Sequence, residues 1–349
     1  MNEQKVHELA LRVIDDMGGA FIMALGYIGD RLHLFKAMAD CRPITSADLA
    51  TRTRLNERYV REWLRAMTAA EYIDYDSSSH AYRMNEEQAL VLANEDSSMF
   101  VGGGFEFTTP SLWNVPRIVE AFRHGGGIPY AEIGEEIPRA IERFFGPSYR
   151  NLLASEWVAA VPGLTKKLEQ GANIADVGCG GGQSSVALAK AFPKSKVLGI
   201  DYHGPSLKRA RKLAAANHLT NVQFIQAPAD RLPRNGYDLV CSFDCIHDMV
   251  DPRATLRAIR EALAPDGRYI WSEPNASAKP DQNRNPIGRT FQAISPLHCM
   301  TVSLAHNGEG LGTVIGEEGA RSLAEEAGFS LFQKLPIHHP LNQFFVLAA

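Results

Sequence analysis

The feature that most constrains the fold of this chain is a glycine-rich run at residues 174–182, which reads Ile-Ala-Asp-Val-Gly-Cys-Gly-Gly-Gly. An apolar strand pattern breaks into this loop, a helical pattern follows at 184–191, and a second apolar run at 197–200 ends in Asp201. Glycines let a backbone approach a ligand closely, and the free amides at a helix start face a negative group. Asp201 lies 19 residues beyond Gly182, about where an acidic side chain holds ribose hydroxyls. The run therefore predicts a nucleoside site.

The glycine spacing indicates which nucleoside fits. Gly178, Gly180 and Gly182 read G-x-G-x-G, whereas a dinucleotide fold needs G-x-G-x-x-G/A, and Gln183 stands near the place of its third small residue. Asp176 adds negative charge where a pyrophosphate would lie, so a cationic ligand suits the site better. In these residues the sequence resembles the class I methyltransferases that use S-adenosylmethionine (SAM). Their signature is an acidic residue, a G-x-G-x-G loop and an acidic residue that closes the second strand.

The rest of the C-terminal half alternates between strand and helix patterns. Strands are expected at 222–225, at 237–243 and from 268 to an end near Glu273-Pro274. A helix is expected at 317–327, closed by Gly328, and a final hairpin at 329–335 and 344–347. This alternation predicts an α/β fold with a parallel, doubly wound sheet. The resemblance implies the seven-stranded, Rossmann-like methyltransferase sheet with an antiparallel last strand.

The N-terminal half reads as a different module. Helices are expected at 2–23, 26–39, 45–51 and 56–69, and a small hairpin at 72–75 and 81–84. Together these elements predict a helical winged-helix domain. The segment Leu55–Leu64 resembles that domain in bacterial and plant small-molecule methyltransferases, which implies a role in dimerisation and substrate covering.

Three domains are therefore expected: a winged-helix and dimerisation domain at 1–95, a helical linker and active-site cover at 96–149, and a SAM-binding methyltransferase domain at 150–349. Within the linker, the glycine runs 102–104 and 125–127 bracket a helix at 111–122 and predict either hinges or plain loops. Further helices are expected at 134–145 and 148–161.

The resemblance also implies the site residues. His247 follows the fourth strand, at the family's histidine or aromatic position near the transferred methyl, and either Asp244 or Asp248 would orient its imidazole; alternatively, His247 bonds a loop carbonyl. The long insertion 275–316 suggests a binding loop that carries a second base candidate, His298. Trp157 is equally consistent with core and with a ligand wall. The candidate cofactor-binding residues are Asp176, Gly178, Gly180, Gly182, Asp201, Tyr202, Ala229, Asp230, Phe243 and Asp244.

Composition narrows the function further. The net charge is −4, and residues 1–100 hold 11 Lys and Arg against 16 Asp and Glu, the wrong sign for a DNA-binding surface. No apolar run approaches the roughly 18 residues of a membrane span, and five cysteines without paired spacing are typical of a reducing cytoplasm. His338 and His339 would face opposite sides of a strand, so no metal site is expected.

These observations predict a cytoplasmic, SAM-dependent methyltransferase that moves a methyl group to an oxygen, nitrogen or carbon nucleophile of a small molecule. The apolar run 21–25 on the first helix predicts a homodimer. Two alternatives remain: a SAM-binding transcriptional regulator that uses the winged helix on DNA, and a nicotinamide-dependent dehydrogenase.

Overall fold

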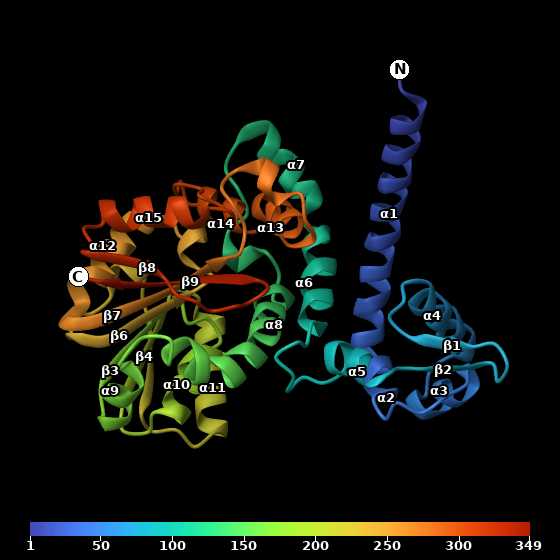
Figure 1. Cartoon of the computed structure of the whole chain (residues 1–349), viewed down its shortest axis with the longest axis horizontal. Coiled ribbons are helices and arrows are strands. Elements are labelled where there is room, and N and C mark those ends of the chain that lie inside the picture. Colours follow the sequence, from blue (N-terminus) through green and yellow to red (C-terminus); the bar gives the residue numbers. More distant parts are fainter. The chain divides into compact units, whose positions relative to one another are not determined.

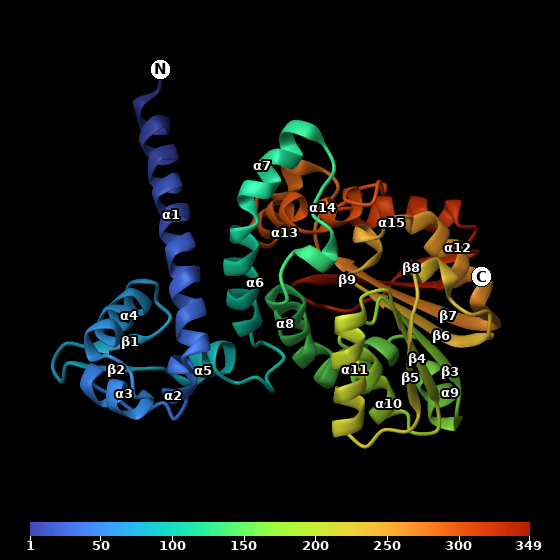
Figure 2. The same ribbon diagram turned by 180° about the vertical axis from the view of Figure 1, so that it is seen from behind.

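The computed structural model describes residues 1–349 and divides into two compact units. The first contains Met1–Pro110 and Arg139–Pro147, and the second contains Ser111–Pro138 and Ser148–Ala349 (Figures 1 and 2). The expected three-domain division at residues 95 and 149 stays a prediction. None of the helices has both the length and the apolar character that crossing a membrane requires.

The first unit contains the expected winged helix. Asn56 and Thr45 cap the two helices of the helix-turn-helix by accepting backbone N–H bonds, and the apolar face of the second helix buries Val60, Trp63 and Leu64. The elements are α1 (Glu3–Arg31), α2 (Leu34–Ala37), α3 (Ser46–Thr53), α4 (Glu57–Ala69), β1 (Asp74–Asp76), β2 (Ala81–Arg83), α5 (Glu86–Leu92) and most of α6 (Gly102–Trp113). β1 and β2 pair antiparallel as the wing.

The predicted break between helices 2–23 and 26–39 is wrong, because α1 runs without interruption for 29 residues. The two buried glycines of α1, Gly26 and Gly29, are places where aromatic rings pack against the helix backbone. A Cβ at Gly26 would lie 2.5 Å from the ring of Phe105, and one at Gly29 would lie 2.5 Å from the ring of Trp63. Rings that belong to α6 and α4 therefore pack directly onto the backbone of α1, and the glycines do not end it.

The glycine run 102–104 is likewise neither hinge nor loop, because it forms the first turn of α6. A Cβ at Gly103 would lie 2.6 Å from the backbone nitrogen of Phe144 and 2.7 Å from the carbonyl oxygen of Ala140. The second run does form a turn: Gly125 and Gly126 have φ values of 75° and 76° after α7 (Val115–His124).

The second unit is built on a seven-stranded sheet in the order β5-β4-β3-β6-β7-β9-β8. Only β9 runs antiparallel to its neighbours, which confirms the predicted fold. Helices α12 and α15 lie on one face of the sheet, and α10 and α11 on the other (Figures 1 and 2). The strands are β3 (Asn173–Val177), β4 (Lys196–Asp201), β5 (Val222–Gln226), β6 (Tyr237–Phe243), β7 (Leu263–Pro274), β8 (Leu331–Lys334) and β9 (Asn342–Ala348).

The helical elements that complete this part of the chain refine two further expectations. The predicted helices 134–145 and 148–161 are one helix, α8 (Glu136–Leu152), which continues into a π-helical segment, η2 (Leu153–Val158). The insertion 275–316 is largely helical, because it contains η5, α13 and α14. The elements are η1 (Tyr130–Glu132), α9 (Leu164–Gln170), α10 (Gln183–Ala191), α11 (Gly204–Ala216), η3 (Ala229–Arg231), η4 (Ile246–Asp248), α12 (Pro252–Ala262), η5 (Pro280–Asn283), α13 (Pro286–Leu297), α14 (Cys299–Leu304) and α15 (Gly316–Glu326).

The glycine packing can be tested with two helical glycine-to-alanine variants. Gly103→Ala forces a methyl group against backbone atoms that cannot rotate away, so we expect a loss of about 1–3 kcal/mol of stability. Gly19→Ala is the matched control, because no atom lies within 4 Å of the added carbon and the helix gains up to about 1 kcal/mol. Thermal denaturation should give melting temperatures in the order Gly19→Ala, wild type, Gly103→Ala. Equal melting temperatures for wild type and Gly103→Ala would contradict the close packing.

Candidate active site

The carboxyl ends of the parallel strands meet at one edge of the sheet, where open α/β sheets bind ligands. The loop after β3 carries Gly178, Gly180 and Gly182, whose φ values of 72°, 49° and 75° are the left-handed conformation that favours glycine. A Cβ at Gly178 would lie 2.6 Å from the Cys245 sulfur. One at Gly180 would meet no atom within 4 Å, so the loop has an open side.

Asp176 lies beneath this loop and is buried. Its Oδ2 accepts hydrogen bonds from the hydroxyls of Ser184, at 2.6 Å, and Ser185, at 2.5 Å, both in the first turn of α10. Burial raises the pKa of this carboxyl, and the two hydroxyl bonds oppose that rise. Asp176 therefore fastens β3 to α10, and its predicted contact with a cofactor stays a prediction.

Asp201, at the end of β4, lies beside the open side of the loop. Its Oδ2 accepts from the backbone nitrogen of Gly180 at 2.8 Å, and its Oδ1 accepts from that of His203 at 2.7 Å. The carboxylate thus joins the glycine loop to the start of α11. A carboxylate is an acceptor of the kind that ligand hydroxyls need.

The remaining candidate cofactor residues lie on neighbouring elements of the second unit. Tyr202 follows Asp201 and is 48% exposed, and Ala229 and Asp230 belong to η3 after β5. Phe243 ends β6, and its ring packs against Tyr149 at 5.4 Å and Trp157 at 5.6 Å between centroids. Trp157 is 2% exposed, and its indole N–H has no hydrogen-bond partner.

His247 lies just past β6, in η4, and is fully enclosed by protein. Its Nδ1 lies 2.5 Å from the Oε2 of Glu273, and the Oε1 of Glu273 accepts from the indole nitrogen of Trp271 at 2.7 Å. The expectations that Asp244 or Asp248 orients the imidazole, or that a loop carbonyl holds it, are therefore wrong. Glu273 holds it instead. Sequence reasoning placed Glu273 at the end of a strand without assigning it a role, although that strand end lies on the ligand-binding edge.

The charges around His247 set its protonation. Burial opposes the charged imidazolium, but Glu273 and Cys299 together outweigh burial and hold the pKa of His247 well above its ordinary value. Burial and then the charge of Glu273 raise the pKa of Asp244 to about 7, and burial raises that of Asp248 to about 7. Asp244 also accepts a hydrogen bond from the side-chain amide of Asn342 at 2.5 Å.

His298, the second base candidate, lies between α13 and α14 and is 5% exposed. Burial, and next the charge of His247, lower its pKa to about 4, so its imidazole is neutral at pH 7. The site thus brings together the carboxyl groups of Asp201, Asp244, Asp248 and Glu273. A cationic ligand beside them would favour their charged forms.

Two family models match the chain. Residues 168–328 match a model described as a methyltransferase domain, and residues 20–94 match the Rv2258c-like winged HTH domain. The ubiquinone biosynthesis O-methyltransferase of Acinetobacter baylyi is 26% identical over 182 residues, which are 51% of this chain and 72% of that enzyme. The same enzyme of Bordetella avium is 33% identical over 153 residues, which are 43% of this chain and 57% of that enzyme.

Solved structures share the whole architecture. The mitomycin 7-O-methyltransferase MmcR has a TM-score of 0.72 at 19% identity, with 100% of both chains covered. Human N-acetylserotonin methyltransferase in complex with SAM has a TM-score of 0.68 at 18% identity, with 97% of both chains covered. At these identities the structures establish a common fold. Residues 168–328 are therefore a methyltransferase domain and residues 20–94 a winged helix-turn-helix domain, on a fold that the chain shares with solved methyltransferases.

Proposed function

We propose that this chain transfers a methyl group from SAM to an oxygen, nitrogen or carbon nucleophile of a small molecule, at the carboxyl edge of its seven-stranded sheet. The observation that carries the proposal is the hydrogen bond from the glycine loop at Gly180 to the Asp201 carboxylate, at the carboxyl edge of the sheet. The regulator and dehydrogenase alternatives lack a comparable observation.

The residues at this edge fit the cofactor. The Asp201 oxygens would hold the ribose hydroxyls, the loop amides would lie along the nucleoside, and Ala229 and Asp230 would border the adenine. Tyr202 and Phe243 would supply apolar walls, and Asp244 would add negative charge. When bound, SAM supplies an electrophilic methyl group on a positively charged sulfonium, which the surrounding carboxyls favour.

His247 is proposed as the base, and Glu273 as the residue that positions it. The bond to Glu273 fixes the ring through Nδ1, and the side chain of Cys299 is its second hydrogen-bond partner. Nε2 is the nitrogen that we propose takes a proton from the nucleophile once a substrate is bound. His298 remains a second base candidate. A nucleophile that is already deprotonated needs only orientation, which can itself supply roughly 7–11 kcal/mol of the barrier.

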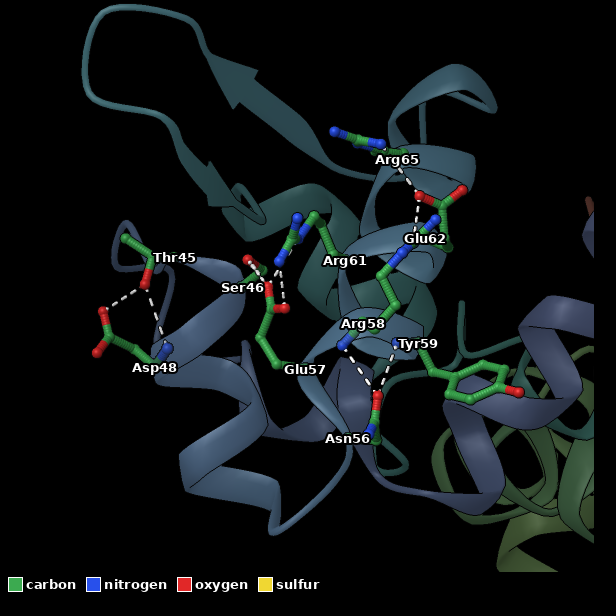
Figure 3. A network of polar contacts seen from close by, with 10 residues as sticks. All are labelled: Thr45, Ser46, Asp48, Asn56, Glu57, Arg58, Tyr59, Arg61, Glu62 and Arg65. Atoms are coloured by element: carbon green, nitrogen blue, oxygen red, sulfur yellow. Dashed lines mark hydrogen bonds and ion pairs between the residues drawn. The ribbon is translucent and has the colours of Figure 1, made fainter.

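The winged helix is proposed to have no DNA-reading role. Three arginines of α4 are paired with acidic residues of the same helix (Figure 3). Arg58 contacts Glu62 at 2.5 Å, Arg65 contacts Glu62 at 3.0 Å, and Arg61 forms an ion pair with Glu57. These pairs neutralise the cations that would meet DNA phosphates. A gel shift with mixed-sequence duplex DNA at low salt tests the regulator alternative.

The function is tested first through the cofactor. The purified protein should bind SAM and its demethylated product, S-adenosylhomocysteine (SAH), and Asp201→Ala should weaken both by about 1.5–3 kcal/mol because a charged acceptor is lost. Titration calorimetry measures both affinities, with NAD as the control ligand for the dehydrogenase alternative. Wild-type affinity in the variant, or binding of NAD in place of SAM, would refute the assignment.

The base is tested through turnover. His247→Ala should keep SAM affinity within a few fold and lose about 10²–10⁴-fold in turnover. His306→Ala is the matched control, because that histidine is exposed. A screen of phenol, indole and amine libraries with methyl-labelled SAM would supply the substrate for single-turnover measurements.

The pH dependence separates a base from a structural histidine. A base must be neutral, so wild-type turnover should rise with pH as the imidazolium loses its proton through its raised pKa. Glu273→Gln removes the counter-charge and lowers that pKa, so the rise should move to lower pH. Identical profiles over pH 6–9 for wild type, His247→Ala and Glu273→Gln would show that His247 is structural and would make His298 the next candidate.

The proposal includes a homodimer in the cytoplasm. Residues 1–21 of α1 are exposed, and apolar side chains follow one stripe of this exposed stretch at Val6, Leu9, Val13 and Met17. An apolar stripe of this kind usually marks an interface. The helix is 29 residues long, or about 43 Å at 1.5 Å per residue, which is ample for pairing with a second copy.

Light scattering at micromolar concentration should therefore give twice 38.4 kDa for the wild type. Leu9→Asp combined with Val13→Asp should give 38.4 kDa, because burying two carboxylates in the interface is costly. Gln4→Glu combined with Arg12→Gln adds the same charge to the polar side of α1 and should leave the dimer intact. A monomeric wild type would reject this part of the proposal.

A further inference from the structure

The segment 125–133, here called the strap, joins α7 to α8 within the second unit and is fastened at both ends. After the turn at Gly125 and Gly126, the backbone nitrogen of Ile128 donates to Thr301 Oγ1 of α14 at 3.0 Å in a buried contact. A Cβ at Gly127 would lie 1.9 Å from the carbonyl oxygen of Thr301, so only glycine permits this approach. At the far end, the carbonyl oxygen of Ile133 accepts from the Asn114 side chain at 3.0 Å.

The strap presents the ring of Tyr130 to two separate parts of the site. On one side the ring centroid lies 5.0 Å from that of His203, with the rings 86° apart, and 6.1 Å from that of Tyr202. On the other side it lies 6.1 Å from the ring of His298. His203 and Tyr202 directly follow Asp201, whereas His298 is the second base candidate. One half-buried side chain thus spans the nucleoside side and the substrate side.

We infer that Tyr130 is a positioning residue that closes the ribose side of the site and holds the nucleoside in place. The inference rests on the proposed function, because it requires SAM and SAH to lie against Asp201. Edge-to-face packing on His203 and Tyr202 gives the ring a fixed orientation. Gly127 and Ile128 fasten the strap to α14, which fixes the position of the backbone from which the ring projects.

The consequence concerns release of the nucleoside more than its entry. A ring that covers the ribose must move before SAH leaves, and release of product limits turnover in many enzymes. Removing the ring should accelerate dissociation of SAH and SAM while association changes little. The ring also lies beside His298, so its removal can change substrate turnover as well. The rate of SAH dissociation is therefore measured without substrate.

The test measures SAH dissociation from full-length protein by rapid dilution or surface-bound kinetics. Tyr130→Ala should release SAH about three- to tenfold faster, the range expected for a lost aromatic contact. Tyr130→Phe retains the ring and should stay within about twofold of wild type. Phe122→Ala is the matched control, because it removes a 77% exposed aromatic side chain from α7, just before the strap.

A second variant distinguishes a specific contact between Tyr130 and His203 from a general loss of rigidity in the strap. If the Tyr130–His203 pair forms the closure, His203→Ala should also speed release, and the double variant should release SAH no faster than Tyr130→Ala alone. Unchanged release from Tyr130→Ala, equal acceleration by Phe122→Ala, or additive effects in the double variant would overturn the inference while leaving the proposed function standing. Wild-type protein that binds neither SAM nor SAH would overturn the proposed function and the inference with it.

Discussion

The buried carboxyl of Asp176 is the contact on which the geometry of the site depends. A carboxylate enclosed by protein is costly unless hydrogen bonds satisfy it, and here the hydroxyls of Ser184 and Ser185 do so. These bonds join the start of α10 to the end of β3 and so hold both ends of the intervening glycine loop. Within that loop the backbone nitrogen of Gly180 donates to Asp201, so the contact of Asp176 supports the contact of Asp201.

Much of this arrangement was predictable from the sequence because its causes are local. The G-x-G-x-G spacing, the alternation of strands and helices and the acidic end of β4 each lie within a short stretch, and the structure has the expected sheet. The continuity of α1 was not predictable, because Gly26 and Gly29 accept the rings of Phe105 and Trp63 from far along the chain. Without knowledge of these partners, a glycine inside a helical pattern indicates an end as readily as a packing site.

Glu273 was missed for a related reason. The sequence placed it near the end of a strand, but only the parallel pairing of β6 and β7 brings that strand end beside the exit of β6. The nearer acidic neighbours of His247, Asp244 and Asp248, were the obvious partners by spacing. Asp244 accepts a hydrogen bond from Asn342, whereas the imidazole contacts Glu273 on the neighbouring strand. Pairing between strands, and not proximity in sequence, selected the partner.

The two buried histidines, His247 and His298, have pKa values shifted in opposite directions by their surroundings. His247 has a carboxylate partner and a raised pKa, whereas burial and the charge of His247 lower the pKa of His298 to about 4. The imidazole of His298 is therefore neutral at pH 7, whereas the environment of His247 favours its charged form. A cationic ligand nearby would lower the pKa of His247 by repulsion, and loss of its proton would in turn remove the charge that depresses His298. The protonation of both histidines is thus tied to the charge of whatever occupies the carboxyl edge of the sheet.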